Sequence, residues 1–117
     1  MNPVITAPAT VYPARIERVI DGDTVVARLS LGLGVELLQH VQLAGINAPE
    51  RPTEAGKQAR AYVEERLLHR QVTLSVNLQR PRDQFGRVLA VVDVDGSNFN
   101  QELLEESLAV AYGSGKH

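Results

Sequence analysis

The residues best suited to chemistry stand in turns between apolar runs. The segment Asp21–Asp23 is one such turn, and Asn47 and Glu50 lie in a second, which spans 45–50. Pro49 stiffens the second turn because its ring fixes its own φ and restricts the residue before it. Calcium and magnesium prefer carboxylate and amide oxygens, whereas softer metals do not. The two turns therefore predict a hard-cation site if the fold brings them together.

Arginines follow in a charged loop over 78–87. This loop carries Arg80 and Arg82 and ends with the segment Asp83–Arg87. The planar guanidinium of Arg87 is suited to phosphate because it offers a fork of N–H donors. Oxygen ligands for a cation, a carboxylate base such as Glu50 and a phosphate-binding arginine together favour a phosphodiesterase site.

Each of these patterns also has an ordinary structural explanation. Asp and Asn form turns in many proteins because their side chains hydrogen-bond their own backbone. The segment Asp83–Arg87 alone could be a turn with an exposed ion pair, which contributes little stability. His40 and His69 have no partner at metal-ligand spacing, so we interpret both as structural. Tyr62 fits packing on a helix better than stacking on a base.

Composition excludes several classes of protein. The chain has 117 residues, 44% of them hydrophobic and 22% charged, which is typical of one globular domain. It has no cysteine, so disulfides and cysteine-ligated metals are excluded. The formal net charge of −2 argues against nucleic-acid binding by bulk charge, although a local basic patch is compatible with it. Since no apolar run could span a membrane and no signal peptide is evident, we expect a cytoplasmic protein.

Hydrophobic periodicity predicts five strands and two helices. β-Branched residues and alternation indicate strands over 11–20, 24–31, 35–44, 72–77 and 88–94. A helix over 53–68, with Thr53 as its N-cap, follows from apolar residues at every fourth position: Ala55, Ala59, Val63 and Leu67. A short second helix, capped by Ser97 or Asn98, follows from Phe99, Leu103 and Leu104.

This order, β-β-β-α-β-β-α, predicts an α+β fold that is mainly β with helices. It matches a five-stranded, partly open Greek-key barrel of the oligonucleotide/oligosaccharide-binding (OB) kind with two helices. A small antiparallel sheet packed with two helices is the alternative. We expect residues 11–112 to form this domain, with a flexible arm at 1–10 and a flexible tail at 113–117.

Three segments, taken in register, resemble the staphylococcal nuclease (thermonuclease-like) family. They are Val19–Val25, Leu43–Glu50 and Asp83–Ala90, and the agreement in order and spacing extends over residues 14–112. The resemblance implies the same OB-type fold. It also implies a calcium-dependent nuclease that hydrolyses phosphodiester bonds of DNA and RNA.

The resemblance further implies roles for individual residues at the cation. Asp23 matches a calcium-ligating Asp, and Asn47 occupies the place of a second one. Ala48 stands where the family offers a backbone carbonyl to the metal. Asp21 would be a further carboxylate beside the ligands. Glu50 matches the Glu that activates or positions the attacking water.

Phosphate and nucleotide contacts follow in the same way. Arg87 matches one of two arginines that bind the scissile phosphate, and Gln42 occupies the usual place of the other. Phe85 and Tyr112 fall near positions that contact the nucleotide. A modest basic patch for the substrate would come from Arg80 and Arg82.

Gln42 and Asn47 predict reduced activity. Gln donates a neutral hydrogen bond where Arg offers a charged fork, and comparable arginines are worth about 10³–10⁵ in rate. Asn47 keeps a ligating oxygen but removes one negative charge, which weakens calcium binding. Two alternatives stay open: a non-catalytic OB module that binds nucleic acid, which would need no metal, and a protein-interaction module.

The chain ends five residues after Tyr112, whereas members of the family usually continue into a further helix. The sequence therefore predicts a short member that lacks the usual C-terminal helix, either naturally or because the chain has been trimmed. A protein partner or self-association would then cover the apolar surface that the helix leaves open.

Overall fold

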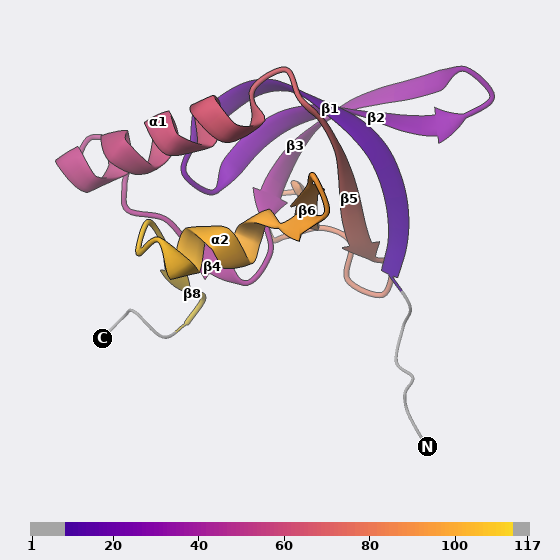
Figure 1. Ribbon diagram of the computed structural model, residues 1–117. Coiled ribbons are helices and arrows are strands. Elements are labelled where there is room, and N and C mark those ends of the chain that lie inside the picture. The colour runs from indigo at the N-terminus through magenta and orange to yellow at the C-terminus, as the bar shows by residue number, and fades with distance from the viewer. Residues whose placement is uncertain (1–8, 114–117) are drawn as a thin grey trace.

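The computed structural model describes residues 9–113 as a strand-rich chain with two helices (Figure 1). The strands are β1 (Ala9–Asp21), β2 (Thr24–Gly32), β3 (Val35–Leu43), β4 (Ile46–Asn47), β5 (Gln71–Asn77), β6 (Val88–Val94), β7 (Ser97–Asn98) and β8 (Val110–Ala111). The helices are α1 (Glu54–Leu67) and α2 (Phe99–Glu105).

Five strands form a closed ring of hydrogen bonds. They pair in the order β3-β2-β1-β5-β6, and β6 pairs back onto β3. The neighbouring pairs are antiparallel except for β3 and β6, which run parallel through residues 41–43 and 88–90. The predicted α+β class, with five strands and two helices, is confirmed.

Alternation along the strands explains which side chains fill the ring. β5 and β6 bury every second residue, as the sequence pattern predicts. These side chains meet buried residues of β1, β2 and β3 in one hydrophobic core, which Phe99 and Leu103 of α2 also join. Packing in this core therefore fixes the positions of the strand ends next to the polar turns.

Helix α1 begins at the predicted cap, where the Thr53 hydroxyl accepts a hydrogen bond from the Gly56 N–H (2.9 Å). The predicted apolar face is confirmed at Ala59, Val63 and Leu67, but Ala55 is exposed and Gly56 is buried in its place. The reason is close packing, since a Cβ at Gly56 would lie 1.9 Å from the Glu50 carbonyl oxygen.

Helix α2 is capped by Asn98, one of the two predicted caps. It packs against α1 through Tyr62, whose ring stacks on Phe99 with centroids 6.2 Å apart. The Tyr62 hydroxyl donates to Glu102 at 2.5 Å, and Arg66 donates two further bonds to the same carboxylate. Tyr62 thus serves helix packing, as interpreted from the sequence.

The observed elements differ from the prediction mainly at their edges. β1 starts at Ala9, two residues inside the predicted arm, because Ala9 and Thr10 pair with β5. The two-residue strands β4, β7 and β8 have no counterpart in the sequence pattern. Residues 1–8 of the predicted arm and 114–117 of the predicted tail lie outside the described residues. Within 9–113, neither helix has the length and apolar character needed to cross a bilayer.

Candidate active site

The turn between β1 and β2 lies directly against helix α1. Gly22 is buried in this turn, and a Cβ there would lie 2.7 Å from the Ala59 Cβ and 2.8 Å from the Ala48 Cβ. Because Cβ atoms do not approach so closely, this packing requires glycine. The contact brings the acidic turn Asp21–Asp23 against the loop that carries Asn47.

Asp23 is half-buried between the turn and this loop. Its Oδ2 accepts the Ala48 N–H at 2.8 Å, and its Oδ1 accepts the Thr24 hydroxyl at 3.1 Å. Burial, together with the neighbouring Asp21 carboxyl, raises the pKa of Asp23 to about 6. Asp21 also closes the turn by accepting the Asp23 N–H at 3.2 Å. A cation between the two carboxyls would relieve both the desolvation and the repulsion.

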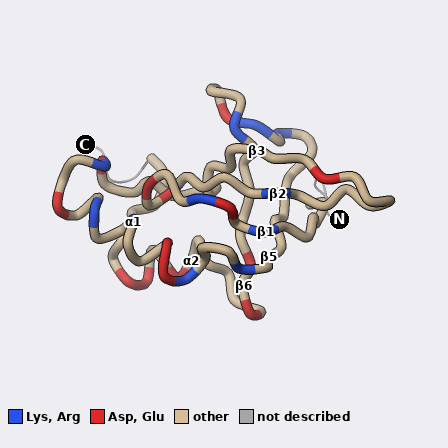
Figure 2. Tube along the Cα trace, turned by 90° about the horizontal axis from the view of Figure 1, so that it is seen from above, with Lys and Arg blue, Asp and Glu red and all other residues tan. Residues whose placement is uncertain are grey.

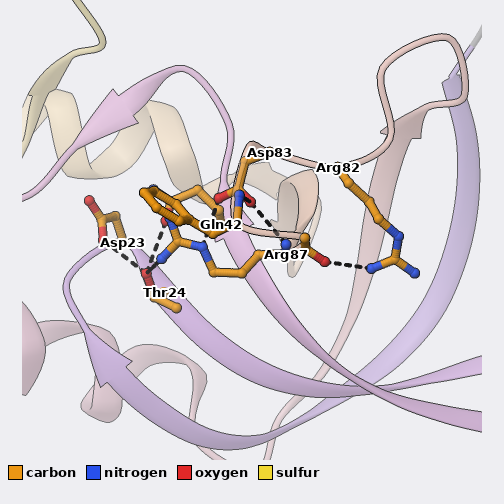
Figure 3. Close-up of polar contacts among 8 residues, drawn as sticks. Asp23, Thr24, Gln42, Arg82, Asp83 and Arg87 are labelled. Atoms are coloured by element: carbon orange, nitrogen blue, oxygen red, sulfur yellow. Dashed lines mark hydrogen bonds and ion pairs between the residues drawn. The ribbon is translucent and has the colours of Figure 1, made fainter.

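Thr24 connects the two halves of the site (Figure 3). Its side chain is buried, with 3% of the residue exposed. The hydroxyl lies 3.1 Å from Asp23 Oδ1 and 3.0 Å from Gln42 Oε1, and it accepts a hydrogen bond from Arg87 Nη1 at 3.3 Å. Since a hydroxyl has one proton, it donates to Asp23 or to Gln42 at any one time.

Arg87 is held in place by its own loop. Asp83 accepts the backbone N–H groups of Phe85 and Arg87 at 2.9 Å each, and its Oδ2 accepts Arg87 Nε at 2.7 Å. Burial alone would raise the pKa of the Asp83 carboxyl, but these bonds outweigh it and hold the pKa below its ordinary value. The guanidinium also lies 5.3 Å from the centre of the Phe85 ring. Among residues 9–113, Arg87 Nη2 has no acceptor, so it can bind a substrate oxygen.

These groups line one open cleft of about 930 Å³. Nine of the eleven predicted site residues border it: Asp21, Asp23, Gln42, Asn47, Arg80, Arg82, Phe85, Arg87 and Tyr112. Glu50 and Ala48 do not border it. The Ala48 N–H is bonded to Asp23, and the exposed Glu50 carboxylate has no hydrogen-bond or ion-pair partner in the described chain. The roles assigned to these residues stay predictions.

Basic residues follow one another on the loop between β5 and β6, which lies beside β3 (Figure 2). Arg82 donates to the Gly86 carbonyl at 2.7 Å and points away from Thr24 (Figure 3). It therefore braces the loop on the side opposite the acidic turn. Arg28 of β2 is ion-paired with Glu17 at 3.2 Å, so it does not replace an arginine at Gln42.

The oxygen groups fit a hard cation. Asp21, Asp23 and Asn47 all border the cleft and offer carboxylate or amide oxygens, which calcium and magnesium accept. Within residues 9–113, no three acidic, histidine or cysteine side chains converge as a ready-made metal centre. The remaining ligands would therefore have to be backbone carbonyls and water.

Sequence reasoning did not predict the contacts that position the site. Asn100 is buried, and its side chain bonds the Ala44 carbonyl at 2.8 Å and the Val92 N–H at 3.0 Å. This tethers the end of β3 to β6 and α2. The Tyr112 N–H donates to the Gly45 carbonyl at 2.8 Å, so β8 holds the far edge of the loop. The contacts of Asn100 with Ala44 and of Tyr112 with Gly45 join residues far apart in the sequence, so no local signal predicts them.

Comparison with known proteins agrees with this geometry. Residues 40–117 match the family described as Staphylococcal nuclease homologue. The chain is 33% identical over 102 residues to a thermonuclease from Staphylococcus intermedius, covering 82% of this chain and 57% of that protein. It is 32% identical over 103 residues to a thermonuclease from Staphylococcus hyicus, covering 83% of this chain and 57% of that protein. An uncharacterized endonuclease from Haemophilus influenzae is 27% identical over 103 residues, which cover 88% of this chain and 54% of the relative.

The family match includes both helices and the segments that carry Asn47 and Arg87. The chain spans 54% to 57% of the length of these relatives. Homology therefore extends to the fold and to the segments that carry Asp23, Asn47 and Arg87. The chain belongs to the staphylococcal nuclease homologue family.

Proposed function

We propose that this chain is a calcium-dependent nuclease that hydrolyses phosphodiester bonds of DNA or RNA. The observation that carries the proposal is that Asp21, Asp23 and Asn47 border the same cleft as the open edge of Arg87. A cation site and a phosphate site on one cleft match the needs of phosphodiester hydrolysis.

The cation would be held by Asp23 and Asn47, with Asp21 beside them and the Ala48 carbonyl as the further predicted ligand. When bound, calcium supplies positive charge to the phosphate oxygens and makes the phosphorus easier to attack. The raised pKa of Asp23 supports this assignment, because a carboxyl that resists ionisation gains most from a neighbouring cation.

The side chains divide the remaining work. Arg87 donates through Nη2 to a non-bridging phosphate oxygen, while Asp83 binds its Nε and Thr24 binds its Nη1. Gln42 accepts from Thr24 through Oε1, which leaves its Nε2 free to donate to the phosphate. The carboxylate of Glu50 takes the proton of the attacking water. The new P–O bond forms as the opposite P–O ester bond breaks, and the leaving oxygen takes a proton from solvent in the open cleft.

This assignment predicts slow turnover. At position 42 the neutral amide of Gln replaces the charged guanidinium that the family usually carries. Comparable arginines raise the rate of phosphoryl transfer by about 10³–10⁵. Asn47 carries one negative charge less than an aspartate, which lowers calcium affinity. Because enzymes accelerate reactions by about 10⁶–10¹⁷, such losses leave a weak enzyme rather than none.

The test is cleavage of labelled single-stranded and duplex DNA with calcium, with magnesium and with a chelator. Wild type should cleave with calcium, Glu50→Ala should be at least about 100-fold slower because it loses the base, and Gln42→Arg should be faster. Glu65→Ala, a change at an exposed helix position outside the cleft, is the matched control. Equal rates for wild type and Glu50→Ala would refute the hydrolytic function.

A second candidate is binding of nucleic acid without turnover. It is favoured by Glu50, whose carboxylate does not border the cleft. Binding would then rest on the arginines of the β5–β6 loop and show a shallow salt dependence of roughly two or three phosphates. Oligonucleotide binding that persists with no cleavage in any metal would identify this function.

A further inference from the structure

A second hollow lies where β3 and β6 separate. The parallel pairing of β3 with β6 begins at Val41 and Val88 and runs to Leu43 and Ala90. Among the described residues, the part of β3 before Val41 does not pair with β6. On that side an open hollow of about 450 Å³ lies between β3 and the loop that leads into β6. It is lined by Leu38, Gln39, His40, Phe85, Gly86 and Arg87. Its size is within the range of small-ligand sites.

The hollow combines apolar surface with free hydrogen-bonding groups. Leu38 is 49% exposed and Phe85 is 73% exposed, so both offer apolar area to a ligand. Gln39 uses its Nε2 on the Leu38 carbonyl at 2.8 Å, which leaves its side-chain oxygen free to accept. The His40 ring has no hydrogen-bond or ion-pair partner in the described part of the chain. A planar ligand with polar edges fits such a lining.

The hollow adjoins the cleft described above. Phe85 and Arg87 border both of them. The guanidinium covers one face of the Phe85 ring at 5.3 Å and leaves much of the rest of the ring exposed. A strand whose phosphate binds Arg87 therefore has the cleft on one side of that phosphate and the hollow on the other.

We propose that this hollow binds one unpaired base of the nucleic-acid strand whose phosphate lies at Arg87. The inference rests on the proposed function, because the phosphate at Arg87 sets the position of the base. The base lies against Leu38 and the exposed part of Phe85, and His40, on the same face of β3 as Leu38, contacts its polar edge. Stacking on an aromatic ring is the main way in which proteins hold unpaired bases. An extended peptide at the open edge of β3 is the competing occupant.

The test measures binding, with turnover blocked by Glu50→Ala. The probes are fluorescein-labelled hexathymidylate and a set of the same oligonucleotide with one abasic sugar at each position in turn. We expect one position, next to the bound phosphate, at which loss of the base weakens binding roughly 5- to 150-fold. Leu38→Ala with His40→Ala should weaken binding of the intact probe and remove the response to that abasic position. Val35→Ala, on the same strand but outside the hollow, should behave as the parent.

A second readout does not depend on the double variant folding. The ring protons of His40, assigned with His40→Gln, should shift when hexathymidylate is added and should not shift with the abasic probe. Unchanged affinities for every probe in the folded double variant would overturn the proposal while leaving the nuclease function standing. The proposal would also be overturned if the hollow binds an apolar extended peptide while none of the abasic sites changes the affinity for the oligonucleotide. If the parent neither binds nor cleaves any oligonucleotide, the proposed function itself fails.

Discussion

Thr24→Val removes the hydroxyl that joins the acidic turn to Arg87. Valine has nearly the same shape and the same preference for strands, so the backbone of β2 is retained. The change removes the contacts with Asp23 at 3.1 Å, with Gln42 at 3.0 Å and with Arg87 at 3.3 Å.

The size of the effect follows from these contacts. The hydrogen bond that the Thr24 hydroxyl donates contributes about 1 kcal/mol to stability. The bond that it accepts from the charged Arg87 would contribute about 1.5 kcal/mol at ideal length, and it contributes less at 3.3 Å. Gln42 and Arg87 border an open cleft and regain water, so no buried group is left unpaired. The added methyl group returns up to about 0.8 kcal/mol. We expect a net loss of about 1 kcal/mol in the free energy of unfolding.

Urea denaturation followed by circular dichroism measures this loss as a lower midpoint at constant m value. Thr73→Val is the matched control, since Thr73 is a half-buried strand residue whose side chain has no hydrogen bond to any of residues 9–113. The partly buried Asp23 also loses a donor, so its pKa should rise further above about 6. If Thr24→Val is as stable as wild type and the carboxyl pKa is unchanged, the hydroxyl does not hold the site together.

Three further outcomes are expected from denaturation experiments. Asp83→Asn should destabilise the protein at pH 7, where the Asp83 carboxylate is ionised and bonded to Arg87. These bonds outweigh burial, so the pKa of Asp83 is lower in the folded than in the unfolded state, and the stabilisation is lost as pH falls through the folded-state pKa. The difference should therefore shrink in acid, and a pH-independent difference would contradict this. Asn100→Ala should cost about 2–3 kcal/mol in unfolding free energy by leaving buried backbone groups unpaired, and a cost below 0.5 kcal/mol would contradict that account. Gly22→Ala should cost about 1–3 kcal/mol through the 2.7 Å approach to Ala59, and adding Ala59→Gly should recover part of it; failure to recover any would place the strain elsewhere.

The long elements could be predicted because each carries its own local signal. β6 alternates buried and half-buried residues along its whole length, and α1 starts at a Thr that binds the N–H of Gly56. The short strands could not be predicted, since β4 pairs with β8 across most of the chain and two residues show no periodicity. Gly56 lies on the buried face of α1 because the Glu50 carbonyl packs against it, and Glu50 is outside the helix.

The polar residues next to the strand ends could be predicted as members of the candidate site, but the contacts that connect them could not. Asp23, Asn47 and Arg87 stand in turns where polar residues invite attention, and the fold brings them to one cleft. Thr24 gave no signal because threonine is an ordinary strand residue, and only the pairing of β2 with β3 sets it opposite Gln42. The sequence predicts that Asp83 forms a turn. Its ion pair with Arg87 is seen only in the structure.

The parallel seam between β3 and β6 has a consequence for the order of folding. It joins residues 41–43 to 88–90, two segments far apart in the chain, whereas the β2–β3 hairpin is local. Closing such a non-local pair is slow because the intervening chain loses entropy before the contact forms. We therefore expect the seam to form late, with amides of 88–90 protected from hydrogen exchange after those of the hairpin. Since Gln42 and Arg87 stand on opposite sides of this seam, we expect the phosphate site to form only once the seam has closed.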